Sequence, residues 1–142
     1  MKVTYKESIE YKILTLIKRS TKTVFLRKDF VTLGGYRQVS RALNKLIELK
    51  KLVKIGFGIY AKAYQSEYID YPLIQEGFEV AARKALDRLG VQWELSSPEQ
   101  AYNEGKTQQV PVNNMVKLKA RFRRKIAYQN RALLFEGNVN AR

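Results

Sequence analysis

The stretch "GGYRQVSRALNKLIEL", residues 34–49, constrains the fold of this chain more than any other segment. At 100° per residue, its apolar side chains gather on one side of a helix and its polar side chains on the other. The apolar side holds Val39, Ala42, Leu43, Leu46 and Ile47. Two β-prone runs follow at residues 52–55 and 59–64, and the "GFG" between them signals a hairpin. A helix with one packed side therefore leads directly into a two-stranded hairpin.

The residues before this helix predict three further elements. Residues 8–20 carry apolar side chains at helical spacing behind a serine N-cap. Residues 23–26 form a short β-prone run, and residues 27–33 read as a short helix. We expect Gly34 and Gly35 to end that helix, because glycine adopts the positive φ of a helix C-cap. The order helix, strand, helix, helix, hairpin is that of a winged helix-turn-helix, with the hairpin as the wing.

The second half of the chain mixes both kinds of element. "EGFEVAARKALDRLG" predicts a strong helix ended by Gly90, Trp93 lies in a short extended run, and "SSPEQAYNEG" carries a helix-capping pattern. Four β-prone segments follow, at residues 107–114, 115–122, 123–128 and 131–137. The fold class is therefore predicted as α+β. The expected domains are a winged helix DNA-binding domain at residues 1–66 and a small α+β domain with basic C-terminal strands at residues 67–142.

Charge is the strongest compositional signal. The net charge is +14 and the sequence pI is about 10.0. Residues 1–62 carry 15 basic and 4 acidic side chains, residues 63–105 carry 3 and 8, and residues 106–142 carry 9 and 1. Two basic lobes around an acidic middle favour a nucleic-acid partner over a merely basic protein without a polyanion partner.

Absent residue types narrow the function further. The chain has no Cys and no His, which excludes disulfides, zinc fingers and nucleophiles paired with histidine. No apolar run approaches the roughly 20 residues of a membrane span, and the N-terminus lacks the apolar core of a signal peptide. We therefore expect a cytoplasmic protein with no membrane partner, no cofactor, no metal site and no enzymatic activity.

In a helix-turn-helix, the N-terminal part of the second helix reaches base edges in the major groove. Arginine pairs with guanine there, and glutamine or asparagine pairs with adenine. The candidates for base readout are Tyr36, Arg37, Gln38, Ser40, Arg41 and Asn44. The candidates for phosphate and wing contacts are Lys22, Arg27, Lys28, Lys45, Lys51, Lys54, Phe57 and Lys62. The alternative is an ordinary solvated face, although such faces usually alternate the sign of charge.

Two features of these basic regions each allow two interpretations. Phe57 at the wing tip either inserts into DNA or packs on the domain body, and the sequence slightly favours packing. A second basic surface comprises Lys117, Lys119, Arg121, Arg123, Arg124, Lys125 and Arg131. With Phe122 and Tyr128 exposed, it would suit RNA. In the favoured alternative, the rings of Phe122 and Tyr128 lie in a core and the cations lie on the solvent-exposed face of the strands.

One short motif indicates an enzymatic alternative, a nuclease. Glu104 and Lys106 match the E-x-K end of a nuclease metal site, but the nearest upstream aspartate, Asp87, lies in a predicted helix. A turn after the short helix explains Gly105 better, so we expect no nuclease.

The chain also resembles a known family. "KTVFLRKDFVTLGGYRQVSRALNKLIELKKLVKIGFGIYAKA" resembles the N-terminal winged helix of AbiEi-type antitoxins and of related uncharacterised prokaryotic proteins, and "ALDRLGV", "AYN" and "TQQVPV" resemble the start of their second domain. The resemblance covers about residues 8–115. It implies a type IV toxin–antitoxin antitoxin that represses its own promoter at a duplex operator, such as an inverted repeat. Its C-terminal region would counteract a nucleotidyltransferase-like toxin, directly or indirectly. The alternative is an RNA-binding or general nucleic-acid-binding accessory protein of a mobile element or phage.

Overall fold

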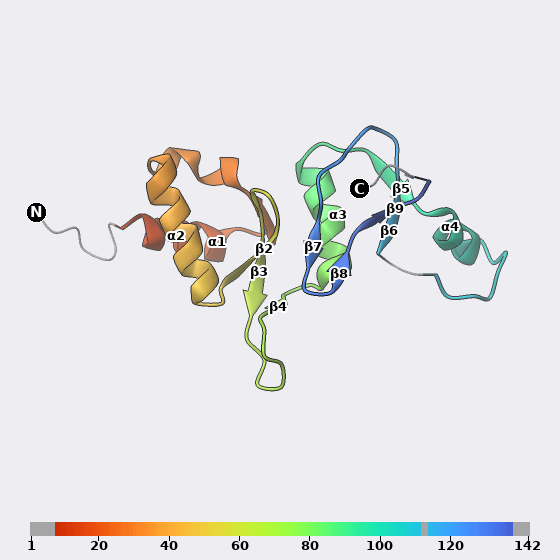
Figure 1. The fold of residues 1–142 in the computed structure, drawn as a ribbon, viewed down its shortest axis with the longest axis horizontal. Helices are drawn as coiled ribbons and strands as arrows, with labels where there is room; N and C mark the ends of the chain where they lie inside the picture. Colours follow the sequence, from red (N-terminus) through yellow and green to blue (C-terminus); the bar gives the residue numbers. More distant parts are fainter. Residues whose placement is uncertain (1–7, 112–113, 138–142) are drawn as a thin grey trace, which may run out of the picture. The chain divides into compact units, whose positions relative to one another are not determined.

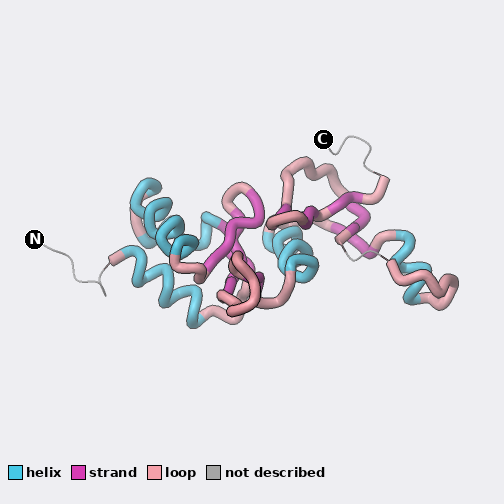
Figure 2. Tube along the Cα trace, turned by 60° about the horizontal axis from the view of Figure 1, so that its bottom comes forward, coloured by secondary structure: helices cyan, strands magenta, loops and turns pink. Residues whose placement is uncertain are grey.

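The computed structural model describes residues 8–111 and 114–137 of the chain. The fold is α+β, as predicted, and it divides into two compact units, an N-terminal unit of Met1–Gly77 and a C-terminal unit of Phe78–Arg142 (Figure 1). Each unit contains both helices and strands (Figure 2).

The helices of the N-terminal unit follow the predicted order. Helix α1 spans Ile9–Arg19, and the Tyr11 backbone N–H donates to the Ser8 side chain at 3.1 Å, which caps the helix. A short 3₁₀ helix, η2, spans Arg27–Leu33, and α2 spans Tyr36–Glu48.

The sheet of this unit is built around one central strand. Strand β3, Ile59–Tyr64, pairs antiparallel with β1, Val24–Leu26, on one side and with β2, Leu52–Gly56, on the other. The β2–β3 hairpin is the one predicted from "GFG", and it contains an irregularity between Lys54 and Gly56.

The core of the N-terminal unit lies between its helices and its sheet. Buried side chains from α1, η2, α2 and all three strands β1, β2 and β3 meet there, and the rings of Phe25 and Phe30 lie 5.9 Å apart. The buried cluster consists of Ile13, Ile17, Phe25, Phe30, Val39, Ala42, Leu43, Leu46, Leu52 and Tyr60. Burying a side chain of this size stabilises the fold by about 1.5–3 kcal/mol.

The two glycines before α2 do end η2, but the predicted conformation is wrong. Gly34 has φ 170° and ψ 179°, an extended conformation open to any residue, and Gly35 has φ −67° as the N-cap of α2. Steric room, and not backbone conformation, favours glycine at position 34, because a Cβ there would lie 2.4 Å from Cδ1 of the Ile9 side chain. The glycine thus lets the turn pass close to α1.

The boundary between the units falls later than the expected break between residues 66 and 67. Residues 73–74 form a strand, β4 (Leu73–Ile74), that pairs antiparallel with the end of β3, so that Ala63 opposes Ile74. In addition, the Thr23 hydroxyl donates to the carboxylate of Glu76. The segment read as a connector therefore belongs to the N-terminal unit.

The C-terminal unit opens with α3, Phe78–Arg88, whose apolar stripe is buried as predicted. Gly90, with φ 75°, lies in the turn that follows the helix. Helix α3 contacts the short strand β7. The other elements are β5 (Trp93–Leu95), α4 (Ser97–Asn103), β6 (Met115–Leu118), β7 (Ala127–Tyr128), β8 (Arg131–Ala132) and β9 (Leu134–Phe135). Strand β6 pairs antiparallel with β5 and parallel with β9, and β7 pairs with β8.

Three of the predicted strand segments, 107–114, 115–122 and 123–128, are wrong in whole or in part. Residues 107–111 form no strand, and residues 112 and 113 of that segment lie outside the described residues. Pro111 lacks the backbone N–H that a ladder needs. Residues 119–126 form no strand either, and Phe122 and Ile126 are the β-prone residues among them.

Candidate nucleic-acid interface

Helix α2 presents two different faces. Val39, Ala42, Leu43 and Leu46 are buried against the core, where α1 contacts α2. The opposite face is exposed and carries Arg37, Arg41 and Asn44, with Gln38 and Lys45 beside them. The apolar and polar side chains that the helical periodicity assigned to opposite sides therefore do lie on opposite faces of α2.

The N-terminal end of this face is held by an arginine from η2. The Arg27 guanidinium lies 3.9 Å from the ring centroid of Tyr36, and its Nη2 donates to the Tyr36 carbonyl and to the Ser40 hydroxyl, both at 2.7 Å. The ring of Tyr36 remains 72% exposed. Arg27 and Ser40 thus bind each other and fix η2 to α2, a pairing that the sequence does not reveal because 13 residues separate them.

Gln38 also has a structural role. Its Oε1 accepts a hydrogen bond from the Gly35 backbone N–H at 3.1 Å, which satisfies one of the open donors at the start of α2. Because Gly35 has no side chain to cap the helix, this reciprocal contact is the cap. The amide nitrogen of Gln38 is left as the donor that can face a ligand.

The hairpin tip carries an exposed aromatic ring. Phe57 is 79% exposed, so the favoured expectation that it packs on the domain body is wrong. Lys54 Nζ lies 5.6 Å from the ring centroid. The tip is anchored by a hydrogen bond of 3.0 Å from the Arg27 backbone N–H to the Gly58 carbonyl. The hairpin therefore presents a ring and a cation together.

The remaining predicted cations of this unit differ in their surroundings. Lys22, Lys28 and Lys51 are exposed. Lys45 pairs with Glu48 at 3.8 Å. Lys62 is half-buried, and its Nζ donates to the Ser20 carbonyl at 3.0 Å, which joins the sheet to the end of α1. Lys62 is thus oriented toward the protein.

The second basic set divides into two groups. Glu94 pairs with Lys117 at 3.9 Å and with Lys119 at 3.6 Å, and Arg131 pairs with Glu79. The other members, Arg121, Arg123, Arg124 and Lys125, are exposed on the irregular segment between β6 and β7. The accompanying rings of Phe122 and Tyr128 are half-buried, and Phe122 meets Phe135 edge to face at 5.9 Å.

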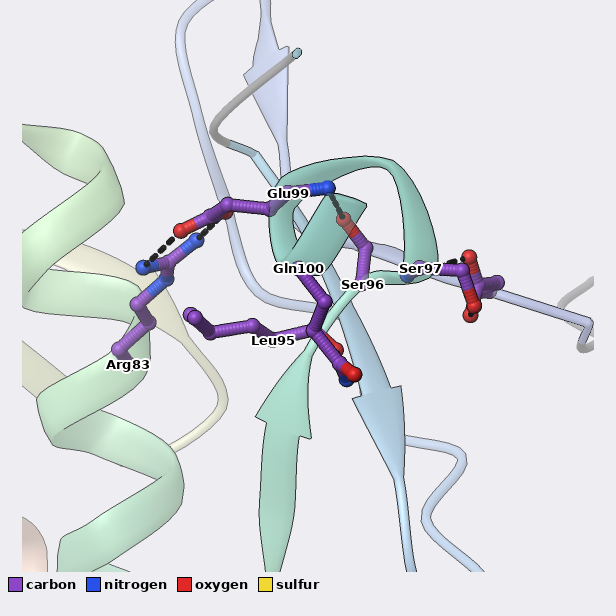
Figure 3. Close-up of polar contacts among 7 residues, drawn as sticks. Arg83, Leu95, Ser96, Ser97, Glu99 and Gln100 are labelled. Atoms are coloured by element: carbon purple, nitrogen blue, oxygen red, sulfur yellow. Dashed lines mark hydrogen bonds and ion pairs between the residues drawn. The ribbon is translucent and has the colours of Figure 1, made fainter. Parts of the chain in front are cut away.

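A polar cluster that the sequence did not predict joins α3 to α4. Arg83 Nη2 donates to Glu99 Oε1 at 2.8 Å, and both side chains are largely buried (Figure 3). The Arg83 guanidinium also lies 5.3 Å from the Trp93 ring centroid, and Trp93 Nε1 donates to Asp87 at 2.8 Å. The Ser96 hydroxyl accepts from the Glu99 N–H at 3.4 Å and caps α4 (Figure 3). These contacts hold the unit together.

The E-x-K residues lie at the end of α4. Glu104 is its C-cap and pairs with Lys106 at 2.7 Å, while Gly105 makes the turn with φ 75°. Within the described ranges, no three His, Cys, Asp or Glu residues are grouped closely enough to hold a metal ion. The described helices are also all too short or too polar to cross a membrane.

These features define an α+β protein with an exposed, cation-rich helix face beside a hairpin. The chain belongs to DUF6088, a family of unknown function, whose model matches residues 12–140. Searches of curated proteins and of solved structures found no match.

Proposed function

We propose that the N-terminal unit is a winged helix-turn-helix that binds duplex DNA in a sequence-specific way. In this proposal η2 and α2 are the helix pair, α2 enters the major groove, and the β2–β3 hairpin is the wing. The element order and the antiparallel pairing of β1, β3 and β2 support this assignment. The protein would act as a transcriptional regulator.

One observation carries the proposal: the exposed face of α2 is cationic along its first three turns. Arg37 and Arg41 are one turn apart on this face, and Glu48, in the last turn, is the only acidic residue of the helix. A solvated helix usually gains stability from opposite charges three or four residues apart, which this face lacks in its first turns. Guanidinium groups at this spacing suit the N7 and O6 acceptors of guanine.

The Arg27 contact supports the same use of α2. By stacking on Tyr36 and bonding to its carbonyl, Arg27 fixes the end of the helix that would approach the bases. A DNA-contacting helix that is already ordered in the free protein loses less conformational entropy when it binds. We therefore assign Arg27 and Ser40 a positioning role and give Arg37, Arg41 and Asn44 the base contacts.

Lysines around the helix and on the hairpin would contact phosphates. Lys22, Lys28, Lys51 and Lys54 are exposed and fit this role, and Phe57 at the tip would contact the sugar–phosphate backbone or a groove. Such contacts orient a protein on DNA without reading sequence.

The resemblance to AbiEi-type antitoxins gives a narrower proposal. The chain would repress its own promoter through the N-terminal unit, and its C-terminal unit would counteract a nucleotidyltransferase-like toxin. Expressing that toxin together with each unit and scoring growth would test this role.

The DNA-binding proposal is tested by selecting the duplexes that the protein binds from a random pool and by footprinting the protein on the selected duplex. Arg37→Ala and Arg41→Ala should each weaken the selected duplex by about 1–3 kcal/mol and leave random duplex binding nearly unchanged. Lys12→Ala, an exposed cation on α1, is the matched control. Base readout by α2 would be contradicted if the selection enriched no sequence. It would also be contradicted if the arginine variants lost the same affinity for selected and for random duplexes.

A further inference from the structure

The segment that joins β6 to β7, residues 119–126, forms a cationic loop that we call the basic loop. It carries Arg121, Arg123, Arg124 and Lys125, all exposed, and no acidic residue. Both of its ends are anchored. The Lys119 N–H donates to the Gln92 carbonyl at 3.0 Å, and Ile126 is buried with its carbonyl bonded to the Leu133 N–H at 2.9 Å.

The structure distinguishes these four exposed cations from the other cations of the second basic set, Lys117, Lys119 and Arg131. Glu94 pairs with both Lys117 and Lys119, and Glu79 pairs with Arg131. Positive charge is therefore concentrated on this loop, where Arg121, Arg123 and Lys125 form no ion pair with the described residues.

A hollow of about 390 Å³ lies beside these arginines. Arg121 and Arg123 line it together with Phe122 and Phe135, which meet edge to face at 84°. Its volume is near the lower end of the range for small-ligand sites. An aromatic wall and two guanidinium groups at one open hollow suit a planar, anionic ligand.

The one carboxylate at this hollow is already engaged. Glu136 lines it, but Oε1 accepts from the Ser97 N–H and Oε2 from the Ser97 hydroxyl, both at 2.8 Å. The negative charge of Glu136 is thus directed to the start of α4. The hollow is thus lined by two guanidinium groups and by one carboxylate that Ser97 holds in place.

We propose that the basic loop is a second binding site, which takes single-stranded nucleic acid. Arg121 and Arg123 contact its phosphates, and an unpaired base enters the hollow against Phe122 and Phe135. Stacking requires a base that is not already paired and stacked in a duplex, so single strands are favoured. RNA and single-stranded DNA share this chemistry. The site uses no residue of α2 and does not depend on the N-terminal unit binding duplex DNA.

The test measures fluorescence anisotropy of labelled oligonucleotides of about 12 nucleotides with the full chain. Three probes of one pyrimidine-rich sequence are compared: RNA, single-stranded DNA and duplex DNA. The variant is Arg121→Ala/Arg123→Ala, and the control is Lys117→Ala/Lys119→Ala, which removes the same charge from the same unit. The first pair should lower single-strand affinity about tenfold or more, and the control by less than about threefold. The single-stranded probe, RNA or DNA, whose affinity falls more in Arg121→Ala/Arg123→Ala identifies the ligand of the site.

A second variant tests the hollow itself. Phe122→Leu keeps an apolar side chain in place but removes the stacking face, so single-strand affinity should fall about fivefold or more at unchanged net charge. Far-UV circular dichroism checks that the variant is folded, and if it is not, Phe135→Leu replaces it. Equal losses from both double variants would overturn the proposal in favour of general electrostatics. A loss confined to duplex DNA would overturn it in favour of a longer duplex footprint.

Discussion

The guanidinium of Arg27 lies 3.9 Å above the ring of Tyr36 and hydrogen-bonds to the carbonyl of the same residue at 2.7 Å. One side chain of η2 thereby holds both the ring and the backbone at the first residue of α2. The relationship gives the exposed end of α2 a fixed orientation, and it can be tested by itself.

Arg27→Ala should destabilise the N-terminal unit by about 1–2 kcal/mol, because it removes a cation–π contact and two hydrogen bonds. Thermal melting followed by far-UV circular dichroism measures the loss. The neighbouring Lys28 is exposed, so Lys28→Ala should change stability by less than about 0.5 kcal/mol. Trp93, the single tryptophan, lies in the C-terminal unit, and its fluorescence transition should not move in either variant. Equal stability of the two variants would show that the Arg27 contact contributes nothing.

Binding to duplex DNA should be strongly salt-dependent. If about five lysine and arginine side chains neutralise phosphates, affinity should fall about 10²–10³-fold between about 50 and 200 mM salt, because each contact releases counterions. A titration at several salt concentrations gives the slope. An affinity that is flat over this range would rule out the phosphate contacts assigned to the exposed lysines.

The hairpin tip should affect affinity without affecting stability. Phe57→Ala should change the free energy of unfolding by less than about 0.5 kcal/mol, because Phe57 is 79% exposed. Lys54→Ala should weaken selected and random duplexes alike and reduce the salt slope by about 0.9. A large loss of stability in Phe57→Ala would instead mean that the ring packs on the body of the protein.

Lys50→Gly should stabilise the N-terminal unit by about 0.5–1 kcal/mol. Lys50 follows α2 with φ 62°, a left-handed conformation that costs a residue with a Cβ about 1–2 kcal/mol, and the greater freedom of glycine when unfolded offsets part of the gain. The backbone N–H groups of Lys50 and Lys51 bond to the carbonyls of Ile47 and Leu46, so this conformation closes the helix. Lys51→Gly, at a residue without positive φ, should destabilise instead. Urea unfolding distinguishes the two signs.

A fragment of residues 1–77 should fold alone and keep duplex binding, whereas a fragment of residues 1–66 should be less stable. The shorter fragment lacks β4 and the Glu76 carboxylate that accepts from Thr23. Circular dichroism melting of the two fragments measures the difference. Identical melting temperatures would show that residues 67–77 are a connector after all.

The sequence by itself determined the elements that have strong local signals. The apolar stripe of α2, the glycine-bracketed hairpin and the serine caps of α1 and α4 each arise from residues within a few positions of one another, so periodicity and capping chemistry suffice. The exposed positions of Arg37, Arg41 and Asn44 follow from the same periodicity.

The tertiary structure decided what depends on residues that are distant in the chain. Pairing of β4 with β3 places the boundary between the units after residue 77, and Glu94 and Glu79 form ion pairs with part of the second basic set. The contact that a Cβ at position 34 would make with the Ile9 side chain is likewise set by the fold, and the φ of Gly34 gives no reason for glycine. Propensity within a segment does not encode such contacts, because their energy comes from partners brought together only when the chain folds.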